Sequence, residues 1–132
     1  MVIVDTNVLI DVLEDDPQWA QWSAGRLREQ GRIHELVINP VIYAELATMF
    51  DAVEKLDGVL ADLEIGVREI PRPALFLAGK AFAIYRKGGG LKSGVLADFF
   101  IGAHSAVSGF PILTRDSRRY KNYFPTVTLI SP

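Results

Sequence analysis

The chain has 132 residues, of which 49% are hydrophobic and 23% charged, with a formal net charge of −2 and no cysteine. This balance fits one globular domain with its own core, and the lack of cysteine excludes disulfides and thiolate metal sites. No apolar stretch could span a bilayer and no basic segment precedes an apolar run at the N-terminus, so we expect a cytoplasmic protein without a membrane partner.

Strand-like apolar runs alternate with helical periodicities along the whole chain. In chain order they predict a strand at residues 2–4, helices at 6–14 and 17–31, a strand at 34–38, helices at 40–49 and 51–63, a strand at 67–70, helices at 73–85 and 94–108, and strands at 112–114 and 127–130. Such alternation predicts an α/β fold, with a parallel-stranded sheet flanked by helices on both faces. No repeat or linker interrupts it, so a single domain over residues 1–132 is expected.

Several helix boundaries have local signals. Asp16 and Asn39 each stand before a proline, which is the pattern of an N-cap followed by proline at the first helical position. Ser93 can cap the helix at 94–108, and Gly109 is expected to end it.

Four acidic residues occupy places that a simple core would not tolerate. Asp5 and Asp116 directly follow predicted strands, and Glu45 and Asp98 lie on the apolar faces of their helices. A lone buried carboxylate costs several kcal/mol unless it is paired, protonated or bound to metal. Because four gathered acids would repel one another, a hard divalent cation such as Mg²⁺ or Mn²⁺ is the expected partner. Each acid by itself could instead be a helix cap or an ion-pair partner.

Four ordered motifs carry a family resemblance. They are VDTNVLID with Asp5, YAEL with Glu45, ADFFIGAH with Asp98 and ILTRDSRRY with Asp116. Together they resemble the acidic motifs of PIN-domain ribonucleases, and most of all those of VapC-type toxins from type II toxin–antitoxin pairs. The resemblance covers nearly the whole chain. It implies a single PIN domain with Mg²⁺- or Mn²⁺-dependent endoribonuclease activity, usually a homodimer, inhibited by a small antitoxin protein whose tail covers the acidic pocket.

The same resemblance assigns roles to the four acids. Asp5, Glu45, Asp98 and Asp116 are implied as the catalytic acids. Asp5 and Asp98 are the strongest candidates for direct metal ligands, because one ends the first strand and the other lies on a helix with mostly apolar or small faces. Glu45 either binds the ion through water or orients the attacking water. Asp116 can instead cap a short helix that begins after it.

Polar and basic residues complete the predicted site. Asn7 and Thr114 match positions that orient the acids, and Arg115 matches a basic position that can contact phosphate. Residues 86–121 contain seven basic and two acidic side chains, a local excess that can attract RNA. The further residues predicted to hold the RNA backbone are Arg86, Lys87, Lys92, Arg118 and Arg119.

Other conspicuous side chains have simpler interpretations. His104 lies on a mostly apolar helix, so a structural role is favoured over a catalytic one. Tyr120, Tyr123 and Phe124 stand beside basic residues, and either core packing or contact with RNA would explain them.

Two alternatives to a nuclease stay open at this stage. One is a catalytically silent PIN-fold module that binds RNA or protein; the presence of every expected acid counts against it. The other is a phosphatase resembling haloacid dehalogenases, with Asp5 as the nucleophile. That family would have a second acid at position 7, where this chain has Asn7.

Overall fold

The computed structural model describes residues 1–90 and 95–132. Its strands form one five-stranded parallel sheet in the order β3-β2-β1-β4-β5. The strands are β1 Val2–Val4, β2 Leu36–Ile38, β3 Ile65–Val67, β4 Ile112–Leu113 and β5 Leu129–Ile130. The helices are α1 Thr6–Leu13, α2 Ala20–Ile33, α3 Pro40–Ala47, α4 Val53–Asp62, α5 Arg72–Lys87, α6 Leu96–Ser108 and α7 Arg118–Tyr123. Within the described residues, no helix is long and apolar enough to cross a membrane.

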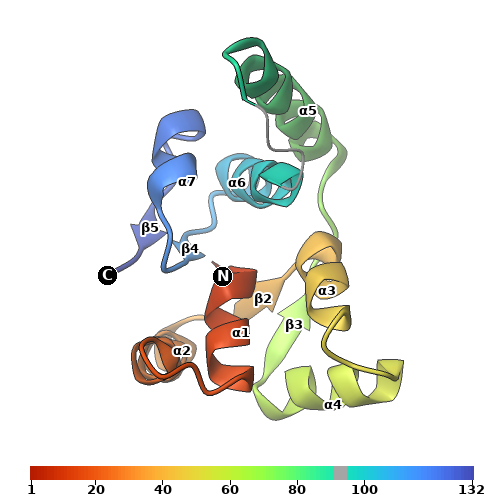
Figure 1. Cartoon of the computed structure of the whole chain (residues 1–132), viewed down its shortest axis with the longest axis vertical. Coiled ribbons are helices and arrows are strands. Elements are labelled where there is room, and N and C mark those ends of the chain that lie inside the picture. The colour runs from red at the N-terminus through yellow and green to blue at the C-terminus, as the bar shows by residue number, and fades with distance from the viewer. Residues whose placement is uncertain (91–94) are drawn as a thin grey trace.

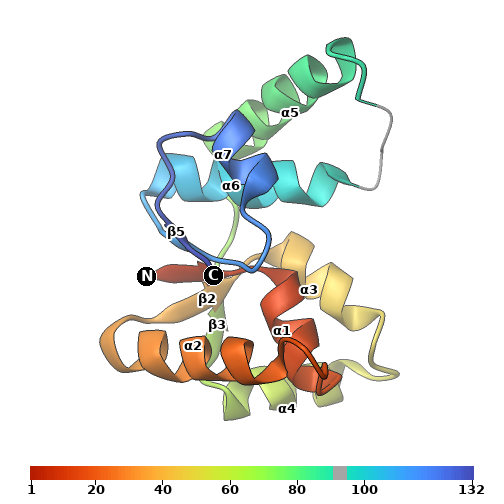
Figure 2. The same cartoon turned by 60° about the vertical axis from the view of Figure 1, so that its left-hand side comes forward.

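Helices cover both faces of the sheet. Figures 1 and 2 show α1, α2 and α4 on one face and α6 and α7 on the other, with α5 packed against α6. β1 is the central strand, and none of its three side chains is exposed. The predicted α/β class, with a parallel sheet between two helical layers, is therefore confirmed.

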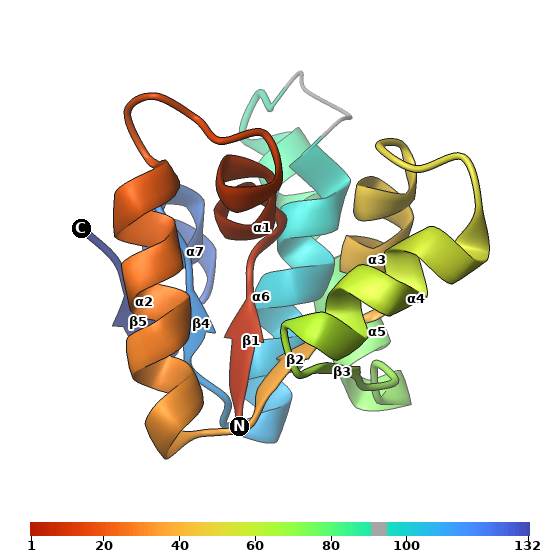
Figure 3. The same ribbon diagram turned by 90° about the horizontal axis from the view of Figure 1, so that it is seen from below.

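The direction in which strands are added reverses at β1. After β1, the strands β2 and β3 follow on one side of it, and α5 and α6 then connect β3 to β4 on the other side. In an open parallel sheet, such a switch point leaves a crevice at the carboxyl ends of the two strands. Figure 3 shows β1 leading directly into α1. Asp5 directly follows β1 and Thr114 directly follows β4, so both residues lie at this crevice.

Two of the predicted helix boundaries are confirmed in atomic detail. The Asn39 side chain accepts a hydrogen bond of 3.0 Å from the backbone N–H of Ile42, as an N-cap does. Gly109 ends α6 in the left-handed conformation, with φ at 72°. The other end of this helix was predicted at residues 93 and 94, which lie outside the described residues.

The predicted start of the second helix was wrong. The Asp16 carboxylate accepts hydrogen bonds from the backbone N–H groups of Gln18 and Trp19, at 2.9 Å each. Asp16 therefore caps a turn that precedes the helix, and α2 begins only at Ala20.

The predicted third strand was also displaced, from 67–70 to Ile65–Val67. Glu64 has a φ of 56°, which turns the chain sharply after α4. The strand consequently begins at the next residue, where Ile65 pairs with Leu36.

Gly102 marks the contact between α6 and the residue that ends α7. A Cβ atom at Gly102 would lie 2.3 Å from the Phe124 ring, whereas one at Gly58 in α4 would meet nothing within 4 Å. We expect Gly102→Ala to lower the free energy of unfolding by about 1–3 kcal/mol through overpacking. Gly58→Ala, the matched control, should raise it by up to about 1 kcal/mol. Urea denaturation of both variants measures the difference, and equal effects would contradict this account of the packing.

Candidate active site

Asp5 is a buried carboxylate at the switch point, with 5% of its surface exposed. Its Oδ2 atom accepts hydrogen bonds of 2.8 Å from Thr114 Oγ1 and Tyr120 OH, and a longer one of 3.4 Å from Asn7 Nδ2. These donors come from α1, from the end of β4 and from α7. The Asp5 carboxylate is therefore fixed by three separate parts of the chain, and a cation would bind it through its other oxygen.

Thr114 and Asn7 also contact each other. Asn7 Nδ2 lies 3.3 Å from Thr114 Oγ1, and Asn7 Oδ1 accepts from the backbone N–H of Arg115 at 3.3 Å. Thr114 Oγ1 further accepts from the backbone N–H of Asp116 at 3.1 Å. The two predicted supporting residues thus connect Asp5 to the loop between β4 and α7.

The other three predicted acids differ in burial and in partners. Glu45 on α3 is half-buried, and its Oε1 accepts a 2.6 Å hydrogen bond from Thr6 Oγ1. Asp98, in the first turn of α6, is half-buried and pairs with Arg119 at 2.8 Å. Asp116 is exposed in the loop before α7, where its carboxylate accepts a long hydrogen bond from the backbone of α7.

The acids act on one another electrostatically. Burial raises the pKa of Asp5 from 3.8 to about 6, and the charge on Asp98 adds to this rise. Burial and the charge on Asp116 also raise the pKa of Asp98, against the lowering effect of Arg119. Burial raises the pKa of Tyr120 well above 10, helped by the charges of Asp5, Asp98 and Glu45. All four carboxylates therefore contribute to one negative field at the crevice.

This donor set fits a hard divalent ion. Burial disfavours the negative charge of Asp5 and of Asp98, the Asp98 charge further disfavours that of Asp5 and the Asp116 charge that of Asp98, and a cation would relieve these effects. In the described part of the chain, no three Asp, Glu or His side chains are placed to hold one metal ion together. Mg²⁺, however, commonly takes only one or two carboxylates and completes its coordination with water.

The predicted RNA-binding cations divide into paired and exposed groups. Arg115 forms an ion pair with Asp11, its Nε lying 2.9 and 3.1 Å from the two carboxylate oxygens. Asp11 is only 1% exposed and also accepts a hydrogen bond from Ser23. The Arg115 guanidinium further lies over the Trp19 ring, 5.7 Å from its centroid. These contacts give Arg115 a structural role that the sequence does not indicate.

The other predicted RNA-binding residues differ in exposure. Arg118 is exposed at the start of α7, and Arg86 and Lys87 are exposed in the last turn of α5. Arg119 is half-buried in its pair with Asp98. Lys92 lies outside the described residues.

Sequence reasoning missed Tyr120 and Thr6 as partners of the acids. Tyr120 is 2% exposed and was open to either a core or an RNA-contacting role; the structure places it in the core with its hydroxyl on Asp5. The Tyr120 hydroxyl group could have indicated this contact, because a buried tyrosine usually has a hydrogen-bond partner for its hydroxyl. The structural interpretation of His104 fits its burial and its 3.3 Å contact with Asn39.

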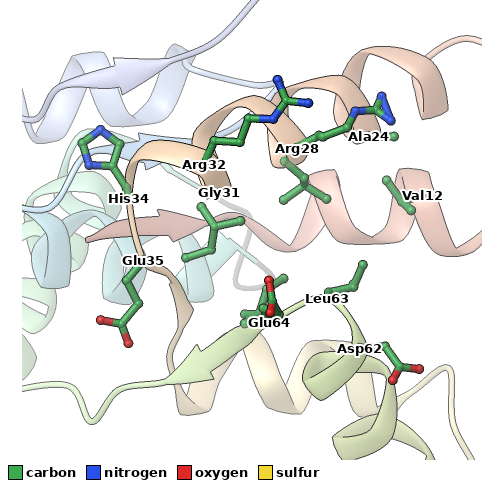
Figure 4. Close-up of a pocket in the computed structure, with 13 residues that line it drawn as sticks. Val12, Ala24, Arg28, Gly31, Arg32, His34, Glu35, Asp62, Leu63 and Glu64 are labelled. Carbon is green, nitrogen blue, oxygen red and sulfur yellow. The ribbon is translucent and has the colours of Figure 1, made fainter.

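A larger cavity lies away from these acids. It has a volume of about 530 Å³ and is lined by α2, β2 and the segment joining α4 to β3. Figure 4 shows Arg28 and Arg32 along one rim and Asp62 and Glu64 on the opposite one. None of the four candidate acids lines this cavity, so its size does not make it the candidate active site.

The fold and the crevice define an α/β domain with a carboxylate site at a switch point. The family model of the PIN domain matches residues 2–125. The chain belongs to the PIN domain family.

Solved structures agree with this assignment. A chain in the crystal structure of VapBC2 from Rickettsia felis, bound to a DNA fragment from their promoter, has a TM-score of 0.73 at 14% identity. A chain of VapBC-1 from nontypeable Haemophilus influenzae has 0.72 at 18%, and one of DNA-bound VapBC from Salmonella typhimurium has 0.68 at 19%. Each match covers 99% of this chain and 98% of the other. No curated protein matches the sequence. The PIN family is thus confirmed by the family model, and the fold is shared with chains of VapBC structures.

We expect the free energy of unfolding of the metal-free protein to depend on pH through the Asp5 carboxylate. Its pKa is 3.8 in the unfolded chain and about 6 in the folded one, so between these values the folded state holds a proton that the unfolded state has lost. The free energy of unfolding therefore falls as pH rises through this window, by up to about 3 kcal/mol from this group. Asp5→Asn, which keeps an oxygen acceptor without the charge, should be more stable than the wild type at pH 8 but not at pH 4.

Urea denaturation in chelating buffer at the two pH values tests this. Asp62→Asn removes an exposed acid elsewhere and serves as the control. If Asp5→Asn were no more stable than the wild type at pH 8, the ionised Asp5 carboxylate would not destabilise the folded state as expected.

Proposed function

We propose that this PIN domain is a Mg²⁺- or Mn²⁺-dependent endoribonuclease and acts in the cytoplasm as the toxin of a toxin–antitoxin pair. The observation that carries the proposal is the buried Asp5 carboxylate at the switch point, which shares its electrostatic field with Asp98. Two such carboxylates with raised pKa values suit a divalent ion better than a neutral ligand.

Asp5 and Asp98 would hold the ion. When bound, it would stabilise the charge that develops on the scissile phosphate and lower the pKa of the attacking water. The protein fixes Asp5 through the hydroxyls of Thr114 and Tyr120, so this carboxylate needs little rearrangement before the reaction.

Glu45 is the residue best suited to handle the proton of the attacking water. The Thr6 hydroxyl donates to its Oε1 atom and leaves its second oxygen to orient or deprotonate water at the crevice. Asp116 extends the negative field towards solvent, and the exposed Arg118 guanidinium beside it can bind the phosphate backbone.

Cleavage of RNA in the presence of metal tests the proposal. Purified protein is incubated with a pool of structured cellular RNAs and Mn²⁺, or with chelator. We expect discrete products only with Mn²⁺, and at least a 100-fold loss of rate in Asp98→Asn, because removal of a metal ligand exceeds the 10–100-fold typical of outer-shell changes. Asp5→Asn should behave in the same way while retaining RNA binding.

Asp62→Asn is the control, because Asp62 is an exposed acid that lines the larger cavity. Equal cleavage by the wild type and by both crevice variants would contradict the assignment. Absence of any product from antitoxin-free protein would favour the alternative of a catalytically silent binding module.

The proposed assembly partners are a small antitoxin protein and a second copy of the chain. Some of the structures similar to this chain are of VapBC, and another is of a toxin–antitoxin complex from Klebsiella pneumoniae, which supports the first. For the second, the outer side of α5 carries exposed apolar side chains, among them Phe76 at 69% and Ile84 at 64%. Such a patch on a small domain is typical of a contact surface.

If α5 forms the homodimer contact, Phe76→Glu should convert a dimer into a monomer by burying a charge in the interface. Multi-angle light scattering after size exclusion measures the mass. Ile33→Glu on α2, where the apolar side chain is equally exposed at 69%, is the matched control and should remain dimeric. A wild type that is monomeric at all concentrations would contradict the homodimer.

A further inference from the structure

A smaller pocket lies beside the carboxylates, between α5 and α7. Its volume is about 300 Å³, and it is lined by Tyr85, Asp116, Arg118, Arg119, Asn122 and Tyr123. Asp116 belongs to both the pocket and the acidic crevice, and Arg119 joins the two through its 2.8 Å ion pair with Asp98. A molecule in this α5–α7 pocket would therefore be next to the proposed reaction centre.

The walls of the α5–α7 pocket are planar and held in place from behind. The Tyr85 and Tyr123 rings meet edge to face at 6.0 Å, and both contact Phe99 in the core, at 5.5 and 5.1 Å. The Arg119 guanidinium lies over the Tyr85 ring, 5.7 Å from its centroid, and is also held by its 2.8 Å ion pair with Asp98. The Tyr85 ring thus supports the Arg119 guanidinium, and a guanidinium plane is one of the surfaces on which unstacked RNA bases lie.

Two exposed polar side chains stand at the mouth of the pocket. Arg118 and Asn122 are four residues apart on α7, so they share one side of the helix. Neither side chain forms a hydrogen bond or ion pair with another of the residues that the structure describes. The Asn122 amide offers both donors and an acceptor, which suits the edge of a base, and Arg118 offers a charged fork for phosphate.

The geometry points to the α5–α7 pocket as a nucleotide subsite, in which one unpaired base of an RNA strand lies against the Tyr85 and Arg119 wall and is read by Asn122. This inference rests on the proposed function and names a substrate contact of that site. The volume is at the small end of ligand pockets, which suits a single nucleotide. The Arg119 charge is already balanced by Asp98, so the exposed Arg118 guanidinium is the group that favours a phosphate-bearing ligand, and an acidic peptide would leave the aromatic surfaces unused.

Binding of short RNAs in chelating buffer tests the subsite without requiring cleavage. Fluorescein-labelled hexamers of adenylate, cytidylate and uridylate are titrated with wild type, Asn122→Ala, Arg118→Ala and Lys121→Ala. We expect the wild type to prefer one hexamer, and Asn122→Ala to weaken that complex by roughly 3–10-fold and so reduce the preference, since one hydrogen-bonding side chain is lost. Arg118→Ala should weaken all three complexes about equally and lower the salt dependence by about one phosphate contact.

Lys121→Ala is the matched control, because it removes one exposed positive charge from the same helix but not from the pocket. It should change each affinity less than twofold. The inference is overturned if the wild type binds no hexamer, if Asn122→Ala keeps the wild-type preference, or if Arg118→Ala and Lys121→Ala behave alike. It is also overturned if a hexaglutamate peptide displaces the RNA as effectively as unlabelled RNA does, and depends equally on Arg118.

The outcomes separate this inference from the proposed nuclease. If the protein cleaves RNA with Mn²⁺ but Asn122→Ala leaves both binding preference and cleavage pattern unchanged, only the subsite fails. If no RNA is cleaved while Asn122→Ala still reduces the binding preference, the subsite holds and the nuclease proposal fails.

Discussion

Burial of the Asp5 carboxylate is the constraint on which the rest of the site depends. A buried carboxylate is costly unless donors or cations compensate it, and here three side-chain donors converge on one of its oxygens. Two of them, Thr114 and Tyr120, come from the last fifth of the chain. The hydrogen bonds from Thr114 and Tyr120 to Asp5, which directly follows the first strand, therefore help to hold the end of β4 and α7 in place. Compensation is incomplete, because burial keeps the pKa of Asp5 high, and a bound cation would reduce this remaining cost.

The positive segment of the chain has two different uses. Arg115 and Arg119 form ion pairs with Asp11 and Asp98, and so fasten the loop before α7 to α1 and α7 itself to α6. Arg118 remains exposed. Arg115 and Arg119 thus hold parts of the site together through ion pairs, whereas Arg118 is available to a ligand. Because the Arg119 pair also forms a wall of the α5–α7 pocket, a single contact links the proposed reaction centre to the proposed base contact.

The sequence predicts the α/β class, the cap at Asn39 and the end of α6 at Gly109, because these depend on periodicity and on backbone preferences within a few residues. The four acids could be singled out because a carboxylate in an apolar pattern is locally anomalous. Two partners of Asp5, Thr114 and Asn7, were indicated by the family resemblance, whereas Tyr120, and Thr6 as the partner of Glu45, were not. Tyr120 contacts Asp5 across 115 residues of chain and Arg115 contacts Asp11 across 104, and such pairings are decided by tertiary packing. The start of α2 was wrong for a related reason, since Asp16 can cap either a turn or a helix and the sequence does not say which.

The distance along the chain between Asp5 and its donors also sets an order of events during synthesis. Thr114 and Tyr120 are synthesised long after the strand that precedes Asp5, and a domain generally folds as a unit. Until then β4 is not available to pair with β1, and the donors to Oδ2 from the C-terminal region are missing. A nascent chain therefore carries the first acid of the crevice without its mature geometry, and the complete carboxylate site forms only as the final helix leaves the exit tunnel.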